Sequence, residues 1–101
     1  MSTNIDKNTI LSKIIKNKEF IDKFGVERIA LFGSYSKNLQ NSESDIDFVI
    51  NFYEKKKTFD NFIGLNLFLE DILGKKVDIV TIESMQDDFF QLIANDIIYA
   101  Y

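Results

Sequence analysis

The sequence contains neither cysteine nor histidine, and these two absences exclude several kinds of chemistry. Without cysteine, the chain can form no disulfide, no thiolate metal site and no thiol nucleophile. Without histidine, it lacks the usual general base, the central residue of a serine-protease triad and the imidazole ligand of zinc. Any catalysis must therefore rest on carboxylates, hydroxyls, lysines, backbone amides and bound cations.

Long apolar segments and an excess of basic residues are also missing. No segment approaches the roughly 20 apolar residues of a membrane helix, and the polar segment 1–8 lacks the apolar stretch of a signal peptide. The net charge of -4 argues against a non-specific grip on nucleic-acid phosphates. We therefore expect a cytoplasmic protein without membrane contact, consisting of one domain over residues 1–101.

What the chain does contain is enough apolar material for a packed core, because 46% of its residues are hydrophobic. Apolar periodicity and the positions of the glycines predict alternating helices and strands. The predicted elements are a helix in one or two pieces over 8–24, a strand over 26–32, a short helical turn, a strand over 45–52, a helix over 58–73, a strand over 76–82, a helix over 85–94 and a terminal edge strand within 97–101. This order indicates an α/β or α+β fold, with a small mixed sheet and helices packed mainly on one face.

Acidic side chains stand at the start of the second predicted strand and within the third. Because strand side chains alternate, Asp45 and Asp47 point to the same side. Like charges at this spacing raise each other's pKa unless a positive charge lies between them, and Mg²⁺ suits such oxygen ligands. If both strands face one cleft, Asp78 completes a cluster able to hold two metal ions. The alternative is that all three acids are strand-end residues, solvated or capping turns.

A Gly-Ser pair follows the first predicted strand directly. Gly33 permits a close backbone approach, while the Ser34 hydroxyl and free amides at a helix start favour an oxyanion. Lys37 adds a cation that can contact a phosphate. The spacing is not that of a P-loop, and a plain turn is the alternative.

Together these blocks resemble the minimal nucleotidyltransferases of the DNA polymerase β-like nucleotidyltransferase superfamily. The resemblance rests on the Gly-Ser pair at 33–34, the Ser-Asp-Ile-Asp run at 44–47, the long helix, and the Gly-Lys-Lys-Val-Asp-Ile-Val-Thr run at 74–81. It implies a fold like the polymerase β palm and covers nearly the whole chain after residue 24. The roles that it implies are catalysis and metal binding by Asp45, Asp47 and Asp78, and nucleotide binding by Gly33, Ser34 and Lys37.

The resemblance also implies a reaction. A metal-dependent enzyme, with two Mg²⁺ ions and ATP as substrate, would transfer AMP to a protein hydroxyl, and a tyrosine is the expected acceptor. Such proteins act as antitoxins that AMPylate a helical HEPN-type toxin, an RNase. Because little chain remains beyond the catalytic sheet, we expect the acceptor to be held by another protein or another copy.

The chain departs from the family pattern after the Gly-Ser pair, where Ala-Arg-Gly is often found. Lys37 keeps the positive charge but loses the bidentate fork of arginine. Asn38 tolerates the left-handed conformation that glycine would supply. Both departures leave the acidic residues intact.

Several features keep two interpretations open. The apolar surplus on the helix over 58–73 marks either an interface or a phenylalanine-rich core, as do the terminal aromatics Phe89, Phe90, Tyr99 and Tyr101. The lysines at 55–57 form a solvated loop or meet an acidic partner or phosphates. We expect Arg28 to form a salt bridge at a strand edge, and Tyr35 either lines a nucleotide site or is a turn aromatic. At the level of function, the alternatives to an enzyme are an antitoxin that only masks its partner and a nucleotide or metal sensor.

Overall fold

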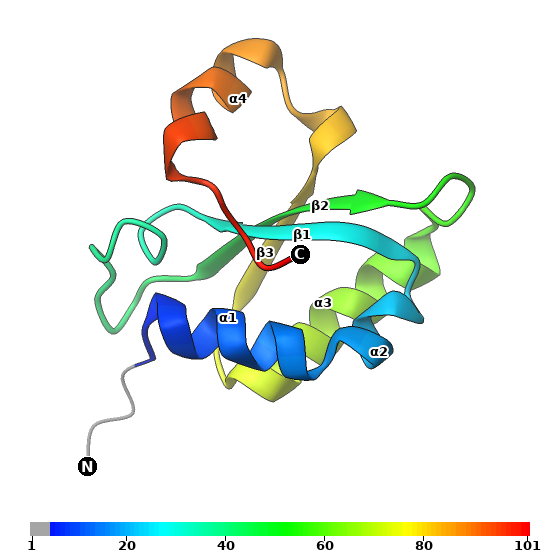
Figure 1. Ribbon diagram of the computed structural model, residues 1–101, viewed down its shortest axis with the longest axis horizontal. Coiled ribbons are helices and arrows are strands. Elements are labelled where there is room, and N and C mark those ends of the chain that lie inside the picture. The colour runs from blue at the N-terminus through cyan, green and yellow to red at the C-terminus, as the bar shows by residue number, and fades with distance from the viewer. Residues whose placement is uncertain (1–4) are drawn as a thin grey trace.

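The computed structural model describes residues 5–101, in which four strands form one mixed sheet in the order β3-β2-β1-β4 (Figure 1). Central strand β2 runs antiparallel to β1 and parallel to β3, while β4 pairs with β1 in the antiparallel sense. The strands are β1 (Val26–Phe32), β2 (Ile46–Phe52), β3 (Val77–Thr81) and β4 (Ile98–Tyr99). Half of the polar segment 1–8, on which the expected absence of a signal peptide rested, lies outside the described residues.

The helices lie on both faces of this sheet, with most of them on one side. Three helices cover the lower face in Figure 1, and a fourth lies above the upper face between two 3₁₀ turns. The lower helices are α1 (Lys7–Lys16), α2 (Lys18–Asp22) and α3 (Phe59–Leu73); the upper segment is η1 (Ile82–Ser84), α4 (Asp87–Ile93) and η2 (Ala94–Asp96). None of the helices formed by residues 5–101 is both long and apolar enough to cross a membrane.

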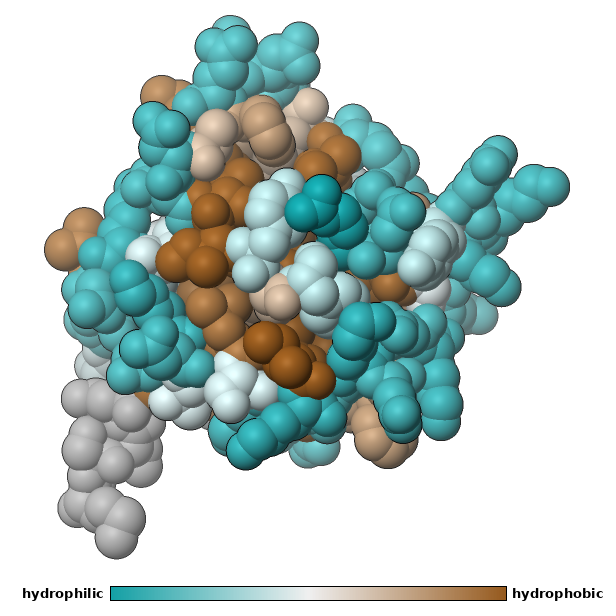
Figure 2. Space-filling view, in the orientation of Figure 1, coloured by the Kyte–Doolittle hydropathy of each residue, from teal (hydrophilic) through white to brown (hydrophobic). Residues whose placement is uncertain are grey.

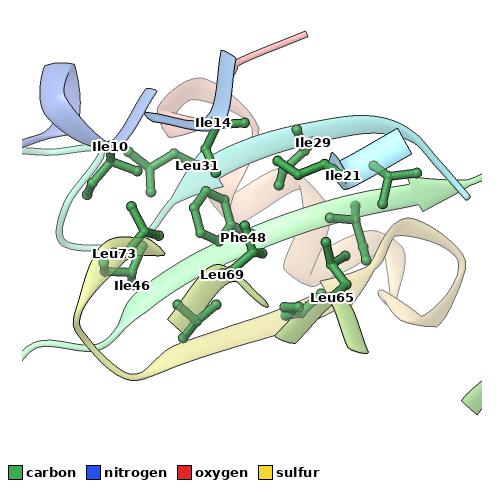
Figure 3. Close-up of a cluster of buried hydrophobic side chains, with 14 of the residues drawn as sticks. Ile10, Ile14, Ile21, Ile29, Leu31, Ile46, Phe48, Leu65, Leu69 and Leu73 are labelled. Carbon is green, nitrogen blue, oxygen red and sulfur yellow. The ribbon is translucent and has the colours of Figure 1, made fainter. Parts of the chain in front are cut away.

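The hydrophobic core lies between the lower helices and the sheet (Figure 3). Strand alternation places Leu31, Phe48 and Ile79 on this face, where each is buried. From the helices, Ile14 and Leu69 are fully buried against them. The apolar stripes of α1 and α3 therefore define which face of each strand is internal, and the other face carries Asp47 and Asp78 together with the buried apolar residues Phe32 and Val49.

Local sequence signals define the ends and the packing of α3. The Thr58 hydroxyl accepts a hydrogen bond from the Asn61 amide at 3.1 Å, as expected of an N-cap. Gly74 ends the helix with φ +69°, in the left-handed conformation of a C-terminal cap. Inside the helix, a Cβ on Gly64 would lie 2.7 Å from Cε1 of Phe24, so glycine there lets the Phe24 ring pack against α3.

The predicted strands and the longer helices are confirmed with shifts of one or two residues at their ends, whereas the short helical turn predicted after β1 is a hydrogen-bonded turn and not a helix. The strand over 26–32 has the predicted bounds, and the helix over 8–24 forms in two pieces, α1 and α2. The last helix is shorter than predicted because Met85 and Gln86 are extended. It also lies on the opposite face, where Phe89 packs edge-on against Phe32 with ring centroids 6.3 Å apart.

Candidate functional site

The end of β1 and the beginnings of β2 and β3 meet at one edge of the sheet. In the register of the sheet, Asp47 stands directly between Phe32 of β1 and Asp78 of β3. All three side chains point away from the core, because their neighbours Leu31, Phe48 and Ile79 point into it. The predicted condition, that β2 and β3 present their acids to one side, is therefore met by Asp47 and Asp78.

The electrostatics of this edge are dominated by negative charge. The pKa of Asp47 is raised from 3.8 to about 6, first by its burial and then by the charges of Asp78 and Asp45. Asp47 is half-buried, whereas Asp78 is exposed. A half-buried carboxylate between two others is a poor arrangement for the protein alone and a favourable one for a bound cation.

Asp45 does not join Asp47 and Asp78 in the three-carboxylate cluster that the sequence predicted. It lies one residue before β2, and its Oδ2 is 3.9 Å from Nζ of Lys76. Among residues 5–101, no three acidic side chains stand close enough together to hold a metal ion as they are placed. The contact of Lys76 with Asp45 was not predicted from the sequence. The available signal was that Lys76 stands two residues before Asp78, at the start of the strand that was expected to lie beside Asp45 and Asp47.

The turn after β1 places glycine against Asp47. Gly33 has φ +78°, and a Cβ there would overlap Oδ2 of Asp47. Its carbonyl accepts hydrogen bonds from the Ser36 hydroxyl at 2.8 Å and the Lys37 amide at 3.3 Å. The Ser34 carbonyl accepts from the Leu39 amide at 2.9 Å. These bonds hold residues 33–39 in a tight turn beside the acidic edge.

The turn contains Lys37 and Asn38, the two residues at which the chain departs from the family pattern. Asn38 has φ +63°, the left-handed conformation that asparagine was expected to tolerate. Lys37 forms an ion pair with Asp96 of η2, with Nζ and Oδ2 3.7 Å apart. To contact a phosphate, the Lys37 ammonium has to leave Asp96.

The structure decides between the interpretations of the remaining residues. Tyr35 is only 2% exposed and belongs to the core. The expected salt bridge of Arg28 is replaced by stacking, since its guanidinium lies 4.1 Å from the centroid of the Tyr99 ring. The lysines at 55–57 follow β2 at its other end and are exposed, and among them Lys57 pairs with Glu83 at 3.2 Å. This position argues against a role on phosphates at the acidic edge.

The donor set at the edge fits a hard divalent cation in its chemistry. Carboxylate oxygens are the ligands that Mg²⁺ prefers, and the charges around Asp47 call for a positive ion. Asp47 and Asp78 are neighbours in the register, whereas Asp45 is paired with Lys76. Asp47 and Asp78 would hold the ion, and Asp45 is the third carboxylate whose charge acts on Asp47.

Comparison with known proteins agrees with this geometry. The family model described as "Nucleotidyltransferase domain" matches residues 11–100. A Methanocaldococcus jannaschii protein with the name "Putative protein adenylyltransferase" is 41% identical over 87 residues, which are 83% of this chain and 87% of that protein. The "Protein adenylyltransferase MntA" of Thermococcus cleftensis is 33% identical over 82 residues, covering 81% of this chain and 82% of the relative.

Solved structures show the same fold. A structure named as that of a "putative minimal nucleotidyltransferase" superposes with a TM-score of 0.81 at 25% identity, over 96% of this chain and 98% of that one. A toxin–antitoxin crystal structure with AMP-PNP gives 0.72 at 26% identity, over 90% and 72%. A complex of tri-AMPylated Shewanella oneidensis HEPN toxin with MNT antitoxin gives 0.66 at 23% identity, over 93% and 71%, and supports the fold alone.

Proposed function

Because the chain belongs to the nucleotidyltransferase domain family, and within it to the protein adenylyltransferases, we propose that it transfers AMP from ATP to a tyrosine of a HEPN-type toxin. In this proposal the chain is the antitoxin, and the reaction depends on Mg²⁺. The observation that carries the proposal is the placement of the Gly33 turn against Asp47, with Asp78 beside it on the same face of the sheet.

The residues of the edge have separate roles in the proposed reaction. Gly33 and Ser34 hold the terminal phosphates of ATP, because the glycine leaves the backbone open to a close approach. Asp45, Asp47 and Asp78 hold Mg²⁺. When bound, the ion would supply positive charge to the triphosphate and to the attacking oxygen. Lys37 adds a second cation to the phosphates once it leaves Asp96.

The chemistry is an in-line displacement at the α-phosphate. The tyrosine oxygen forms a bond to the α-phosphorus, the bond from that phosphorus to the bridging oxygen breaks, and pyrophosphate leaves. In this proposal Asp78, the exposed acid of the three, accepts the phenolic proton. Most of the rate enhancement then comes from position and charge neutralisation, which is consistent with a site that lacks histidine and cysteine.

The partner proposal draws on one of the structural neighbours, at 26% identity. It is a toxin–antitoxin structure with AMP-PNP, an ATP analogue. The sequence resemblance to minimal nucleotidyltransferases points to the same kind of partner. A protein acceptor also fits the name that the curated relatives share, protein adenylyltransferase.

Co-expression with the protein encoded by the neighbouring gene, under the proposal a HEPN-type toxin, tests the proposal. We expect intact-mass spectrometry to find that protein heavier by one or more AMP units, on a tyrosine. Asp45→Asn and Asp47→Asn should each abolish the increment, whereas Asp71→Asn, an exposed acid on α3, should preserve it. If the partner still gains the mass of AMP with either site variant, the proposed mechanism is wrong.

Masking without catalysis is the competing function, and the same samples distinguish it. A pure masking antitoxin would inhibit the partner's RNase activity in a stoichiometric complex without ATP, and no AMP would be found on the partner. Under our proposal, inhibition by the wild-type chain requires ATP and persists after the chain has been removed from the modified partner.

A further inference from the structure

One segment crosses the face of the sheet that bears Asp47 and Asp78. We call residues 82–98, which comprise η1, α4, η2 and the start of β4, the α4 arm (Figure 1). Its end pairs with β1 through Ile98, opposite Leu31. Phe89 packs on Phe32, the register neighbour of Asp47, and ion pairs of Glu83 with Lys57 and of Asp96 with Lys37 hold the two ends.

The arm leaves apolar side chains in solvent. No residue of α4 is buried, and Leu92 is 77% exposed while Phe89 is 42% exposed. In Figure 2, apolar surface extends from this segment down across the middle of the molecule and is bordered by hydrophilic residues. A seven-residue helix is not stable by itself in water, so α4 gains from any partner that covers its outer side.

The charge of the arm limits what that partner can be. The arm contains four acidic residues and no lysine or arginine. Glu83 and Asp96 are neutralised by the ion pairs at its ends, whereas Asp87 and Asp88 are exposed and form no ion pair within residues 5–101. The surface is therefore an apolar centre around Leu92 with an acidic border.

We propose that the α4 arm is the docking surface for the acceptor protein, through an apolar patch of that protein that is bordered by lysine or arginine. The proposal rests on the proposed function, since an acceptor hydroxyl must reach the face that carries Asp47 and Asp78. Docking on the arm brings the acceptor to this face, because Phe89 already lies beside the register neighbour of Asp47.

The acidic border disfavours the other occupants of an exposed apolar face. A second copy that docks through the same arm would bring Asp87 and Asp88 against their own counterparts. Nucleic acid and anionic membranes carry the same sign of charge as the arm. Of these partners, only a protein with an apolar patch and basic residues around it is favoured both by the apolar centre of the arm and by its acidic border.

The outer side of α3 provides a matched control. Leu67 is 62% exposed and shares its side of the helix with Phe59 and Ile63, on the opposite face of the sheet from the arm. Leu92→Asp and Leu67→Asp are thus the same change at two exposed leucines, only one of which lies near the acidic edge. Both positions are solvated, so both variants should fold, as circular dichroism and thermal unfolding will verify.

The experiment uses calorimetry, with AMP-PNP present, to measure binding of the protein that co-expression shows to be AMPylated. We expect Leu92→Asp to weaken binding about tenfold or more and Leu67→Asp to change it by less than about twofold. The double variant Asp87→Lys, Asp88→Lys should weaken binding and reverse its dependence on salt. Unchanged binding in the arm variants, or a greater loss in Leu67→Asp, would overturn the proposal, as would dimerisation of this chain through Leu92.

Two further measurements separate this proposal from the proposed function. Affinity for AMP-PNP alone should be unchanged in Leu92→Asp, while the KM for the protein acceptor rises. Asp47→Asn should keep the complex and lose AMP transfer. If the arm variants weaken the complex but Asp47→Asn still transfers AMP, the docking surface stands and the enzymatic mechanism fails; the reverse pattern refutes the docking surface alone.

Discussion

Gly33 and Asp47 lie so close together that the sheet edge has no room for a side chain at residue 33. A Cβ there would overlap Oδ2 of the Asp47 carboxylate, and φ of +78° independently favours glycine. The turn that follows β1 therefore packs directly against Asp47, the second residue of β2. This contact links the two motif blocks, whose residues Gly33 and Asp47 are 14 positions apart (33 to 47) in the sequence.

Gly33→Ala should damage activity more than stability. The overlap falls on the end of the Asp47 side chain, so the carboxylate moves out of the way and the backbone keeps its path. We expect a loss of about 1 kcal/mol in the free energy of unfolding from the positive φ. A carboxylate displaced by about 1 Å should reduce AMP transfer about a hundredfold.

Gly74→Ala is the control for this prediction. Gly74 also has a positive φ, +69°, but a Cβ there meets no atom within 4 Å. We expect a similar loss of stability in urea unfolding and full AMP transfer. Equal activities of the two alanine variants would show that the contact between Gly33 and Asp47 has no functional importance.

The raised pKa of Asp47, about 6 against 3.8 for the unperturbed group, makes the metal-free protein less stable at neutral pH. Between about pH 4 and pH 6 the folded state binds the proton that the unfolded state has released, so the free energy of unfolding falls as pH rises through this window. Asp47→Asn removes this loss. After allowance for solvent screening of a half-exposed group, the variant should be more stable above pH 6 by about 1 kcal/mol.

Unfolding in urea with EDTA, at pH 4 and pH 8, measures this effect. The difference between Asp47→Asn and the wild type should be near zero at pH 4 and favour the variant at pH 8. Added Mg²⁺ should then raise the stability of the wild type and leave the variant nearly unchanged. A variant that is less stable than the wild type at pH 8 in EDTA would contradict the assignment.

Lys76 should compete with the metal for Asp45, because its ammonium lies 3.9 Å from that carboxylate. Lys76→Met frees Asp45, and the Mg²⁺ concentration for half-maximal AMP transfer should fall about twofold, as expected for an exposed pair of about 0.5 kcal/mol. Lys75→Met is the matched control, since Lys75 contacts the Ser42 carbonyl instead. A higher KM for ATP in Lys76→Met, with unchanged Mg²⁺ dependence, would assign Lys76 to the triphosphate instead.

The two faces of α3 should respond differently to the same truncation. Leu69 is fully buried against the sheet, and Leu69→Ala should lower the free energy of unfolding by about 2–5 kcal/mol. Leu67 is 62% exposed, and Leu67→Ala should change it by less than about 0.5 kcal/mol. Thermal or urea unfolding of both variants tests this, and comparable losses would mean that the outer side of α3 is covered in solution.

The positions of most helices and strands could be predicted from the sequence, because they depend on local patterns of residues. Period-two and period-3.6 patterns, the Thr58 cap and Gly74 define the elements within a residue or two, because these signals depend on neighbours along the chain. The same alternation predicted that Asp45 and Asp47 share a side. The left-handed conformation of Asn38 was predictable for the same reason, since it is a property of the residue and its turn.

The partners of charged side chains depend on which elements become neighbours, and local patterns do not contain that information. Lys37 was expected to contact phosphate and is paired with Asp96, which approaches only because β4 returns to pair with β1. Arg28 stacks on Tyr99 for the same reason. The interaction of Lys76 with Asp45 required the parallel pairing of β2 and β3.

The sequence alone determined the kind of chemistry, because the absence of cysteine and histidine leaves carboxylates and cations, and acidic residues stand at the start of one predicted strand and within the next. Only the tertiary structure decided what surrounds those acids. Sheet order places Asp78 beside Asp47 and Gly33 against it, and the return of the chain to β4 carries the acidic, apolar α4 arm over the same face. The physical reason is that alternation and capping act between neighbours in the chain, whereas the burial and the charge environment of Asp47 depend on strands distant in sequence.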